Sequence, residues 1–395
     1  MKNLIVRTGE RYLRVLYKNA KIYDSHSQTF IEGDLLTDGA LIAAAGNCPR
    51  YDMYDKTEQL DGKMLIPGLI DIHTHGRAGG DFISADNDML VKMSKDYLRT
   101  GVTTLLPTLA SAPLEDMYSA SDRLADLVGK EETCNYAGVH IEGRYLNPKR
   151  RGAHAEKLLA PPNKDELERF VFRMRSRNGQ VHITAALELD ADGSFAKRAI
   201  ELGATLGLGH TDATYEEAIK AIERGAVTFT HLFNAMPPLH HREGGAVCAG
   251  LADSEAFCEI IADGFHISPP MVRLAYLCKR EKLVLITDSM EATGCGDGEY
   301  SIAGMPVTVK DGKARTRDGA IAGSTLDLFD AVQNLSAFAG IPFEKALFCA
   351  TASPAMAVGL YDRTGSLERG KAADMLVLDK NKKILSVIKN GRKIF

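Results

Sequence analysis

The sequence predicts an α/β fold: a (β/α)8 TIM-like barrel that carries a small β-sandwich domain formed by both chain termini. Three observations support it. Strand-like runs occupy both ends of the chain, a strand–helix theme repeats through the middle, and the repeated strands end in histidines and carboxylates. We therefore expect an N-terminal part of the small β domain, a hydrolase barrel and a C-terminal part of the β domain at residues 1–66, 67–365 and 366–395.

Length and composition are compatible with this architecture. The 395 residues are 45% hydrophobic, which is enough for a large core. A net charge of −4 shows no basic excess for nucleic acid. The seven cysteines form no CxxC pair and favour reduced thiols in a cytoplasmic protein. We expect no secretory signal and no membrane span, because the start is charged and no long apolar run occurs.

The two ends of the chain contain short β-type runs separated by turn residues. These runs are Tyr12–Tyr17, Ala20–Tyr23, Gly39–Ala45, Lys63–Ile66, Asp374–Leu378 and Ile384–Lys389. Similar β-rich ends around a different middle predict one small domain made from both termini.

The middle of the chain contains eight apolar runs of strand length. They are Gly68–His75, Val102–Pro107, Tyr136–Glu142, Val181–Glu188, Ala204–His210, Val227–His231, Glu259–Ala262 and Leu283–Asp288. Their apolar residues are continuous, as in strands buried on both faces. Helical segments lie between them, for example Thr214–Arg224 with a capping box at its start. A doubly wound sheet is the competing fold, but no Gly-rich phosphate loop follows the first strand.

After the eighth strand the pattern becomes β-like again. Ser301–Val309 and Lys313–Thr316 predict an inserted hairpin, followed by a helix near Leu326–Ala339.

Five of the eight expected strands end in a side chain that can bind a metal or move a proton. These side chains are His73 and His75, Glu142, His210, His231 and Asp288. The carboxyl ends of barrel strands form the active-site face in TIM barrels, so we expect the six to converge on one mouth.

Each of these residues also has an ordinary structural interpretation. A strand HxH pair is often structural, a lone Glu142 is often a surface carboxylate, and a lone buried histidine is often only hydrogen-bonded. His73 and His75 are two residues apart and so point to one face, where they can grip zinc or iron. Asp288 follows an apolar run, where it either caps the turning chain or accepts a proton from the attacking water. Their joint placement favours a metal site.

Several segments also match a known family in order. They are Pro67-Gly-Leu-Ile-Asp-Ile-His-Thr-His-Gly76, His140-Ile-Glu-Gly143, Asn147-Pro-Lys-Arg-Arg-Gly-Ala-His154, Gly209-His-Thr-Asp212, Thr230-His-Leu-Phe-Asn-Ala-Met236, His240-His-Arg-Glu243, Thr287-Asp-Ser-Met290 and Ala322-Gly-Ser324. The first resembles the signature of the amidohydrolase superfamily. Together, across nearly the whole chain, they resemble the N-acetylglucosamine-6-phosphate deacetylase family.

The resemblance implies roles for individual residues. Glu142, His210 and His231 would hold the main metal, and His73 and His75 a second, giving one or two zinc or iron ions per subunit. Asp288 would be the general base and then the general acid. The substrate would contact Ala153, His154, Asn234, Ala235, Ile321, Ala322 and Gly323. Its phosphate would contact Arg242 and His266, which in this family can reach the substrate across the interface of a homodimer.

The implied reaction converts N-acetyl-D-glucosamine 6-phosphate into D-glucosamine 6-phosphate and acetate, in amino-sugar catabolism or cell-wall sugar recycling. Two departures from the family pattern lie near the mouth: Arg144-Tyr145 where Pro-Phe is expected, and Pro237-Pro238 where Ser or Thr precedes the proline. Either could alter sugar preference.

Other functions remain open at this point. The substrate could be N-acetylgalactosamine 6-phosphate or an unphosphorylated N-acetyl amino sugar. A dihydroorotase or dipeptidase is disfavoured, because Glu142 stands where many of those enzymes use a carboxylated lysine. A metal-free binding protein of the same fold is the alternative from another class.

Overall fold

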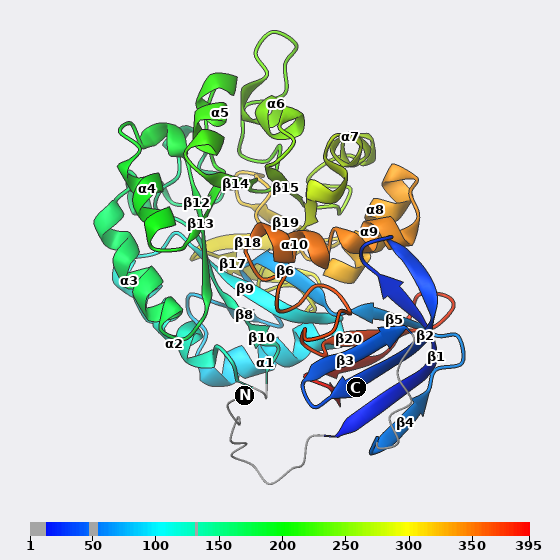
Figure 1. Ribbon diagram of the computed structural model, residues 1–395. Helices are drawn as coiled ribbons and strands as arrows, with labels where there is room; N and C mark the ends of the chain where they lie inside the picture. Colours follow the sequence, from blue (N-terminus) through cyan, green and yellow to red (C-terminus); the bar gives the residue numbers. More distant parts are fainter. Residues whose placement is uncertain (1–12, 47–53, 131–132) are drawn as a thin grey trace. The chain divides into compact units, whose positions relative to one another are not determined.

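The computed structural model describes residues 13–46, 54–130 and 133–395. The chain forms two compact units, one from Met1–Gly68 with Asp362–Phe395 and one from Leu69–Tyr361 (Figure 1). No helix among the described residues is long and apolar enough to cross a membrane.

The unit formed by the two ends contains one eight-stranded sheet. Its strands are β1 (Arg14–Asp24), β2 (Thr29–Asp38), β3 (Leu41–Gly46), β4 (Lys56–Gln59), β5 (Met64–Pro67), β20 (Met375–Leu378), β21 (Ile384–Lys389) and β22 (Arg392–Lys393). The order is β22-β21-β20-β5-β1-β2-β3, with β4 also paired to β1. The two ends join where β5 pairs antiparallel with β20, at Leu65 opposite Val377. Both side chains belong to one buried apolar cluster, which confirms that the termini build a common β unit.

Two details of this sheet differ from the expectation. The runs Tyr12–Tyr17 and Ala20–Tyr23 belong to the single strand β1, which continues through a bulge between Tyr17 and Ala20, while Tyr12 lies outside the described residues. The partner strand β2 was not expected from the sequence, because its residues alternate poorly between apolar and polar.

The second unit is a nearly closed parallel barrel. Its strands are β6 (Leu69–Thr74), β9 (Val102–Ala110), β11 (Gly138–Glu142), β12 (Gln180–Ala185), β13 (Thr205–Leu208), β14 (Ala226–Phe229), β15 (Phe257–Ile260) and β16 (Leu283–Leu285). They pair in this order, and the short β10 (Asn135–Tyr136) also pairs with β9. A parallel bridge between Thr74 and Ser289 brings the chain after β16 back to β6. All eight strands overlap the predicted runs, so the barrel prediction is confirmed.

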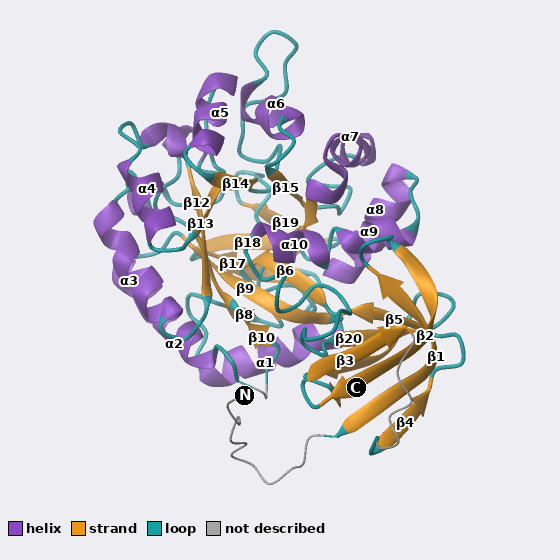
Figure 2. Ribbon diagram, in the orientation of Figure 1, coloured by secondary structure: helices purple, strands orange, loops and turns teal. Residues whose placement is uncertain are grey.

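Helices cover the barrel strands, as the purple ribbons around the orange arrows show (Figure 2). They are α1 (Asn87–Arg99), α2 (Leu114–Leu127), α3 (Lys164–Arg175), α4 (Ser194–Glu201), α5 (Tyr215–Glu223), α6 (Gly245–Ala252), α7 (Pro269–Lys279), α8 (Leu328–Ala339), α9 (Phe343–Phe348) and α10 (Ala352–Ala357). The predicted capping box is present on α5, where Thr214 Oγ1 accepts from Glu217 N–H and the Glu217 carboxylate accepts from Thr214 N–H. A reciprocal cap of this kind satisfies two donors at the helix start.

Two small β elements border the barrel mouth. One is the pair β7 (Gly76–Arg77) and β8 (Gly80–Asp81). The other is a three-stranded sheet of β17 (Gly298–Ile302), β18 (Met305–Lys310) and β19 (Lys313–Thr316), where the sequence predicts a hairpin. Its apolar face packs in one cluster with Met290 and Ala322, which ties the insertion to the loops around Asp288.

Candidate functional site

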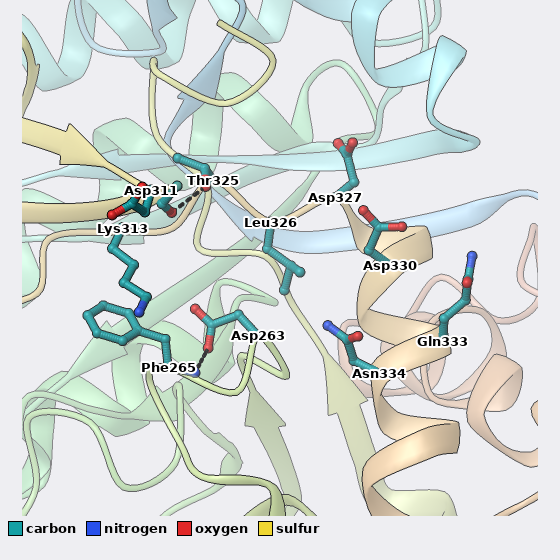
Figure 3. Close-up of a pocket in the computed structure, with 11 residues that line it drawn as sticks. Asp263, Phe265, Asp311, Lys313, Thr325, Leu326, Asp327, Asp330, Gln333 and Asn334 are labelled. Carbon is teal, nitrogen blue, oxygen red and sulfur yellow. Dashed lines mark hydrogen bonds between the residues drawn. The ribbon is translucent and has the colours of Figure 1, made fainter. Parts of the chain in front are cut away.

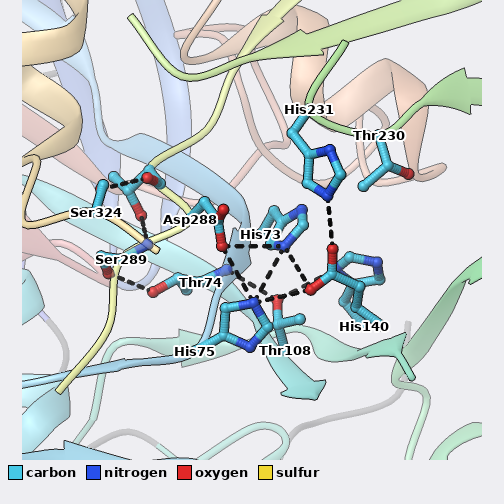
Figure 4. A network of polar contacts seen from close by, with 12 residues as sticks. His73, Thr74, His75, Thr108, His140, Thr230, His231, Asp288, Ser289 and Ser324 are labelled. Carbon is cyan, nitrogen blue, oxygen red and sulfur yellow. Dashed lines mark hydrogen bonds and ion pairs between the residues drawn. The ribbon is translucent and has the colours of Figure 1, made fainter. Parts of the chain in front are cut away.

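Glu142, the last residue of β11, lies in a polar cluster with four histidines at the barrel mouth. Figure 4 shows three of these histidines, His73, His75 and His231, together with Asp288. Its Oε2 atom lies 3.2 Å from His73 Nε2 and 2.9 Å from His75 Nε2. Its Oε1 atom lies 2.8 Å from His231 Nε2 and 3.3 Å from His210 Nε2. One carboxylate therefore faces two pairs of imidazoles, each pair on its own oxygen.

Asp288 lies against only one of these pairs. Its Oδ1 atom is 3.1 Å from His75 Nε2 and 3.5 Å from His73 Nε2. Asp288 is the most exposed member of the cluster, at 13% of its side chain, whereas Glu142 and the two histidines are buried. The structure thus brings together all six strand-end residues, with Asp288 nearest the solvent.

The arrangement fits a divalent metal. Ligand atoms of His73, His75, Glu142 and Asp288 lie close enough together to hold an ion, as do those of Glu142, His154 and His210. His210 Nδ1 lies 2.8 Å from the Arg150 carbonyl oxygen, so Nδ1 carries the proton and Nε2 keeps its lone pair. That lone pair points toward His231 Nε2, 3.1 Å away, a repulsive pairing unless a cation or a proton lies between them.

The electrostatics of the cluster also attract positive charge. Burial lowers the pKa of His75, but Asp288 and Glu142 outweigh this effect and raise the pKa to about 9. Burial raises the pKa of Glu142, but the charge of His73 and hydrogen bonds from the histidines hold it well below its ordinary value. Both effects belong to a site that prefers to hold cations, and zinc or iron suits its imidazole and carboxylate donors.

Three of the clustered residues have left-handed backbones. The φ angles are 47° at His210, 34° at His231 and 49° at Asp288. Each follows its barrel strand by two or three residues, so each strand ends earlier than the sequence predicts and the chain turns sharply into the mouth. This backbone conformation is unfavourable for residues other than glycine, and such strained residues are more frequent at functional sites. No sequence pattern signalled it.

The backbone of Asp288 is fixed from two sides. Its N–H donates to the His73 carbonyl oxygen at 2.9 Å, and its carbonyl oxygen accepts from Ser324 N–H at 2.7 Å. Gly323 has a φ of 66°, and a Cβ atom there would lie 3.1 Å from Asp288 O. The predicted pocket residues Ala322 and Gly323 therefore lie beside Asp288, and the neighbouring Ile321 bridges to Arg315 on β19.

The loop after β11 places His154 next to the cluster. Ser111 N–H donates to His154 Nδ1 at 3.3 Å, so Nε2 carries the proton in the neutral ring and lies 3.9 Å from Glu142 Oε2. Burial, followed by the charge of His210, lowers the pKa of His154 to about 3, so the ring is neutral. A neutral N–H at this position suits donation to a substrate oxygen. Ala153, the preceding residue, packs against the apolar cluster under the β17–β19 insertion.

Asn234 and Ala235 lie in the turn that follows His231. Asn234 donates from both its backbone N–H and its side-chain Nδ2 to the His231 carbonyl oxygen, at 3.0 and 3.2 Å. Ala235 accepts from Thr211 N–H at 3.2 Å, which links this turn to the residue after His210.

Arg242 and His266 are placed differently. Arg242 lies on the exposed segment 238–243, which precedes α6. The side chain of His266 is buried, and its Nδ1 lies 2.6 Å from Asp263 Oδ2. Among the described residues, no hydrogen bond or ion pair joins Arg242 to His266 or to the Glu142 cluster.

A pocket of about 360 Å³ lies beside the His266 loop (Figure 3). The residues that line it are Asp263, Phe265, Asp311, Gly312, Lys313, Thr325, Leu326, Asp327, Asp330, Gln333 and Asn334. Four carboxylates against one lysine make this pocket unsuitable for a phosphate group.

Two positioning interactions near the mouth were missed by the sequence reasoning. Glu188 accepts from Thr211 Oγ1 at 2.6 Å and from Asn147 Nδ2 at 2.9 Å, and so joins the His210 and His154 loops.

The second interaction is an ion pair of Arg144 with Glu166 on α3, with two hydrogen bonds of 3.0 and 3.1 Å. The family departure at Arg144-Tyr145 therefore anchors its loop to α3, because Tyr145 Oη also donates to Glu166, at 2.9 Å. A lone carboxylate in sequence gives no sign of such partners.

Comparisons with known proteins agree with this site. A sequence profile of the amidohydrolase family matches residues 64–394. The chain is 35% identical to the N-acetylglucosamine-6-phosphate deacetylase of Vibrio furnissii, over 84% of this chain and 83% of that one. It is also 35% identical to the N-acetylgalactosamine-6-phosphate deacetylase of Escherichia coli O157:H7, over 81% and 84% of the two chains.

A solved structure shares the whole architecture. A mutant of N-acetyl-D-glucosamine-6-phosphate deacetylase from Mycobacterium smegmatis, in complex with N-acetyl-D-glucosamine-6-phosphate, superposes with a TM-score of 0.87 and 30% identity, covering 96% of this chain and 99% of that one. The chain therefore belongs to the amidohydrolase family and, within it, to the N-acetylglucosamine-6-phosphate deacetylases.

Proposed function

We propose that this protein removes the acetyl group from N-acetyl-D-glucosamine 6-phosphate by hydrolysis, which yields D-glucosamine 6-phosphate and acetate. The observation that carries the proposal is the convergence of four imidazole Nε2 atoms on the two oxygens of Glu142, with Asp288 at the solvent side. The relative solved in complex with this sugar phosphate supports the substrate. We assign the chemistry to the barrel domain, residues 67–365.

Glu142, His210 and His231 are proposed to hold the main metal ion, and His73 and His75 a second one. The two oxygens of Glu142 face the two histidine pairs separately, which supports a carboxylate shared between both positions. When bound, zinc or iron supplies a Lewis acid for the acetamide carbonyl and lowers the pKa of the attacking water. We therefore expect one or two divalent ions per subunit.

Asp288 is proposed to move the protons. Burial raises the pKa of Asp288, but the charge of His73, a hydrogen bond from His75 and the charge of His75 outweigh it and hold the pKa below the ordinary value, so the group is ionised. An ionised carboxylate at this position can accept the proton that the attacking water loses. Asp288 then returns that proton to the amine nitrogen as the C–N bond breaks. His154 donates its Nε2–H to the carbonyl oxygen, where negative charge develops.

The remaining predicted residues are proposed to select the sugar phosphate. Asn234 and Ala235 would contact the sugar from the turn after His231. Arg242 suits the phosphate because a guanidinium donates two parallel hydrogen bonds, and His266 would assist it. The exposed position of Arg242, apart from the Glu142 cluster, supports its action on a neighbouring subunit of a homodimer.

Substrate preference tests this proposal directly. Acetate release should be fastest with N-acetylglucosamine 6-phosphate in a panel that also contains N-acetylgalactosamine 6-phosphate and both unphosphorylated sugars. The galactosamine epimer is the second candidate substrate, because one relative of equal identity carries that name. Higher kcat/KM for an unphosphorylated sugar would overturn the role of Arg242 and His266.

Action of Arg242 across an interface predicts complementation between two inactive variants. A mixture of Asp288→Asn and Arg242→Ala subunits contains hybrid dimers in which one site has both an intact Asp288 and an intact Arg242 from its neighbour. Random reassociation should restore about a quarter of the wild-type activity at low substrate concentration. Activity equal to the sum of the separate variants, or a monomeric protein in sedimentation, would contradict the proposal. Arg317→Ala, a change to another exposed arginine, serves as the control.

The cysteines bear on the cellular compartment, and the Glu142 cluster bears on the binding-protein alternative. The six described cysteines form no disulfide, which favours a reducing compartment such as the cytoplasm. An intact Glu142 cluster with Asp288 beside it disfavours a metal-free binding protein.

A further inference from the structure

Glu259 is a buried carboxylate inside the barrel that the proposed chemistry does not use. It lies on β15, and its side chain is wholly buried. Its Oε2 atom is 3.6 Å from His73 Nδ1, and its Oε1 atom is 3.5 Å from His182 Nε2. TIM-barrel interiors are usually filled by branched apolar side chains, so a charged residue at this depth requires an explanation.

Glu259 and one of its neighbours, His73, have unsatisfied polar atoms. His73 Nδ1 and both carboxylate oxygens of Glu259 have no hydrogen-bond partner among the described residues. Leaving buried polar atoms without a hydrogen bond destabilises a folded protein. The His73 nitrogen and one of these oxygens lie 3.6 Å apart, just beyond hydrogen-bond distance. Pairing them removes two unsatisfied atoms at once.

The other nitrogen of His73 faces the metal cluster. His73 Nε2 lies 3.2 Å from Glu142 Oε2 and 3.5 Å from Asp288 Oδ1. A neutral imidazole carries its proton on only one nitrogen, and a metal needs the other. With the proton on Nε2, the Nδ1 lone pair would point at the Glu259 carboxylate, which is repulsive. With the proton on Nδ1, it is donated to Glu259 and Nε2 is free.

His182 supports the carboxylate from the opposite side. Its Nδ1 lies 2.9 Å from Thr205 Oγ1, which can donate to it and so leave the proton on Nε2, the nitrogen that faces Glu259. Glu259 is thus held between two buried imidazoles, on β6 and β12, and one of them is a proposed metal ligand.

We propose that Glu259 is a positioning residue for His73: it accepts the Nδ1 proton, fixes the ring orientation and directs Nε2 to the second metal ion. Carboxylates that orient metal-binding histidines in this way strengthen metal binding. This inference rests on the proposed function, since it requires an ion at His73 and His75.

Zinc titration of the metal-free full-length protein by calorimetry tests the proposal. In Glu259→Gln the second zinc ion should bind roughly 10- to 100-fold more weakly, while the ion at His210 and His231 keeps its affinity. Thr228→Val is the matched control: Thr228 Oγ1 lies 3.3 Å from His182 Nε2 in the same buried layer, but it does not pair with His73. It should leave both zinc affinities unchanged.

A second measurement does not depend on the folding of Glu259→Gln. In the zinc-loaded wild-type protein, nitrogen NMR of His73, assigned by comparison with His73→Gln, should show the proton on Nδ1. A proton on Nε2, unchanged zinc binding in Glu259→Gln, or equal weakening of both ions would each overturn the role of Glu259. A wild-type protein that binds no second zinc would overturn it as well. Failure of the proposed function is distinguished from these outcomes by absent acetate release in the wild-type protein.

Discussion

Replacement of Asp288 by asparagine is expected to lower kcat by roughly 10²- to 10⁴-fold while metal content stays at the wild-type level. Asparagine keeps the size of the side chain but cannot take a proton from water or return one to the amine. The backbone hydrogen bonds of residue 288, to His73 and from Ser324, survive the change. Substrate should therefore still bind.

Steady-state kinetics and metal analysis of the same preparation check this result. KM should change much less than kcat, because the lost interaction acts in the transition state. Asp297→Asn is the matched control, since Asp297 accepts from backbone N–H groups of Asp311 and Gly312 and lies outside the metal cluster. A fully active Asp288→Asn variant would remove Asp288 from the mechanism.

Replacement of Glu142 by glutamine is expected to lower activity by a comparable factor, because it weakens metal binding. Glutamine removes the negative charge that His73, His75, His210 and His231 face. Changes in residues that only orient metal ligands cost 10- to 100-fold in affinity, so loss of a shared ligand should weaken metal binding by about 100-fold or more. Activity should fall with it.

The measurement is the effect of added zinc on thermal unfolding. Zinc at 100 times Kd stabilises the wild-type protein by about 2.7 kcal/mol, and the same concentration should raise the melting temperature of Glu142→Gln much less. Glu166→Gln is the control, because it breaks the pair with Arg144 without touching the cluster. Retention of both ions and of full activity by Glu142→Gln would show that the cluster is not the metal site.

The barrel could be predicted because its strands are buried on both faces, and this burial leaves long apolar runs in the sequence. The strand-end histidines could be predicted because parallel strands present their carboxyl ends on one face. Strand β2 was missed because its residues mix apolar and polar side chains without a regular alternation, although it lies between β1 and β3 in the small sheet. The role of Glu259 was missed because its partners, His73 and His182, are distant in sequence and meet only in the barrel interior.

The loops were less predictable than the strands. The family resemblance implies that Arg242 and His266 act together, but their positions depend on how long loops pack, and no hydrogen bond or ion pair joins them among the described residues. Arg144, where the chain departs from the family pattern, pairs with Glu166, and no pattern in the sequence connects the two residues.

The left-handed backbones of His210, His231 and Asp288 affect which replacements laboratory evolution of this enzyme would select. Glycine adopts such a conformation at lower cost than histidine or aspartate, so a library screened only for heat resistance should enrich glycine here and yield stable proteins without catalytic activity. Screens that couple survival to acetate release would retain the histidines and find their stabilising changes elsewhere. The same trade-off applies to relatives that have lost hydrolytic activity. In such relatives we expect glycine to replace these three residues early.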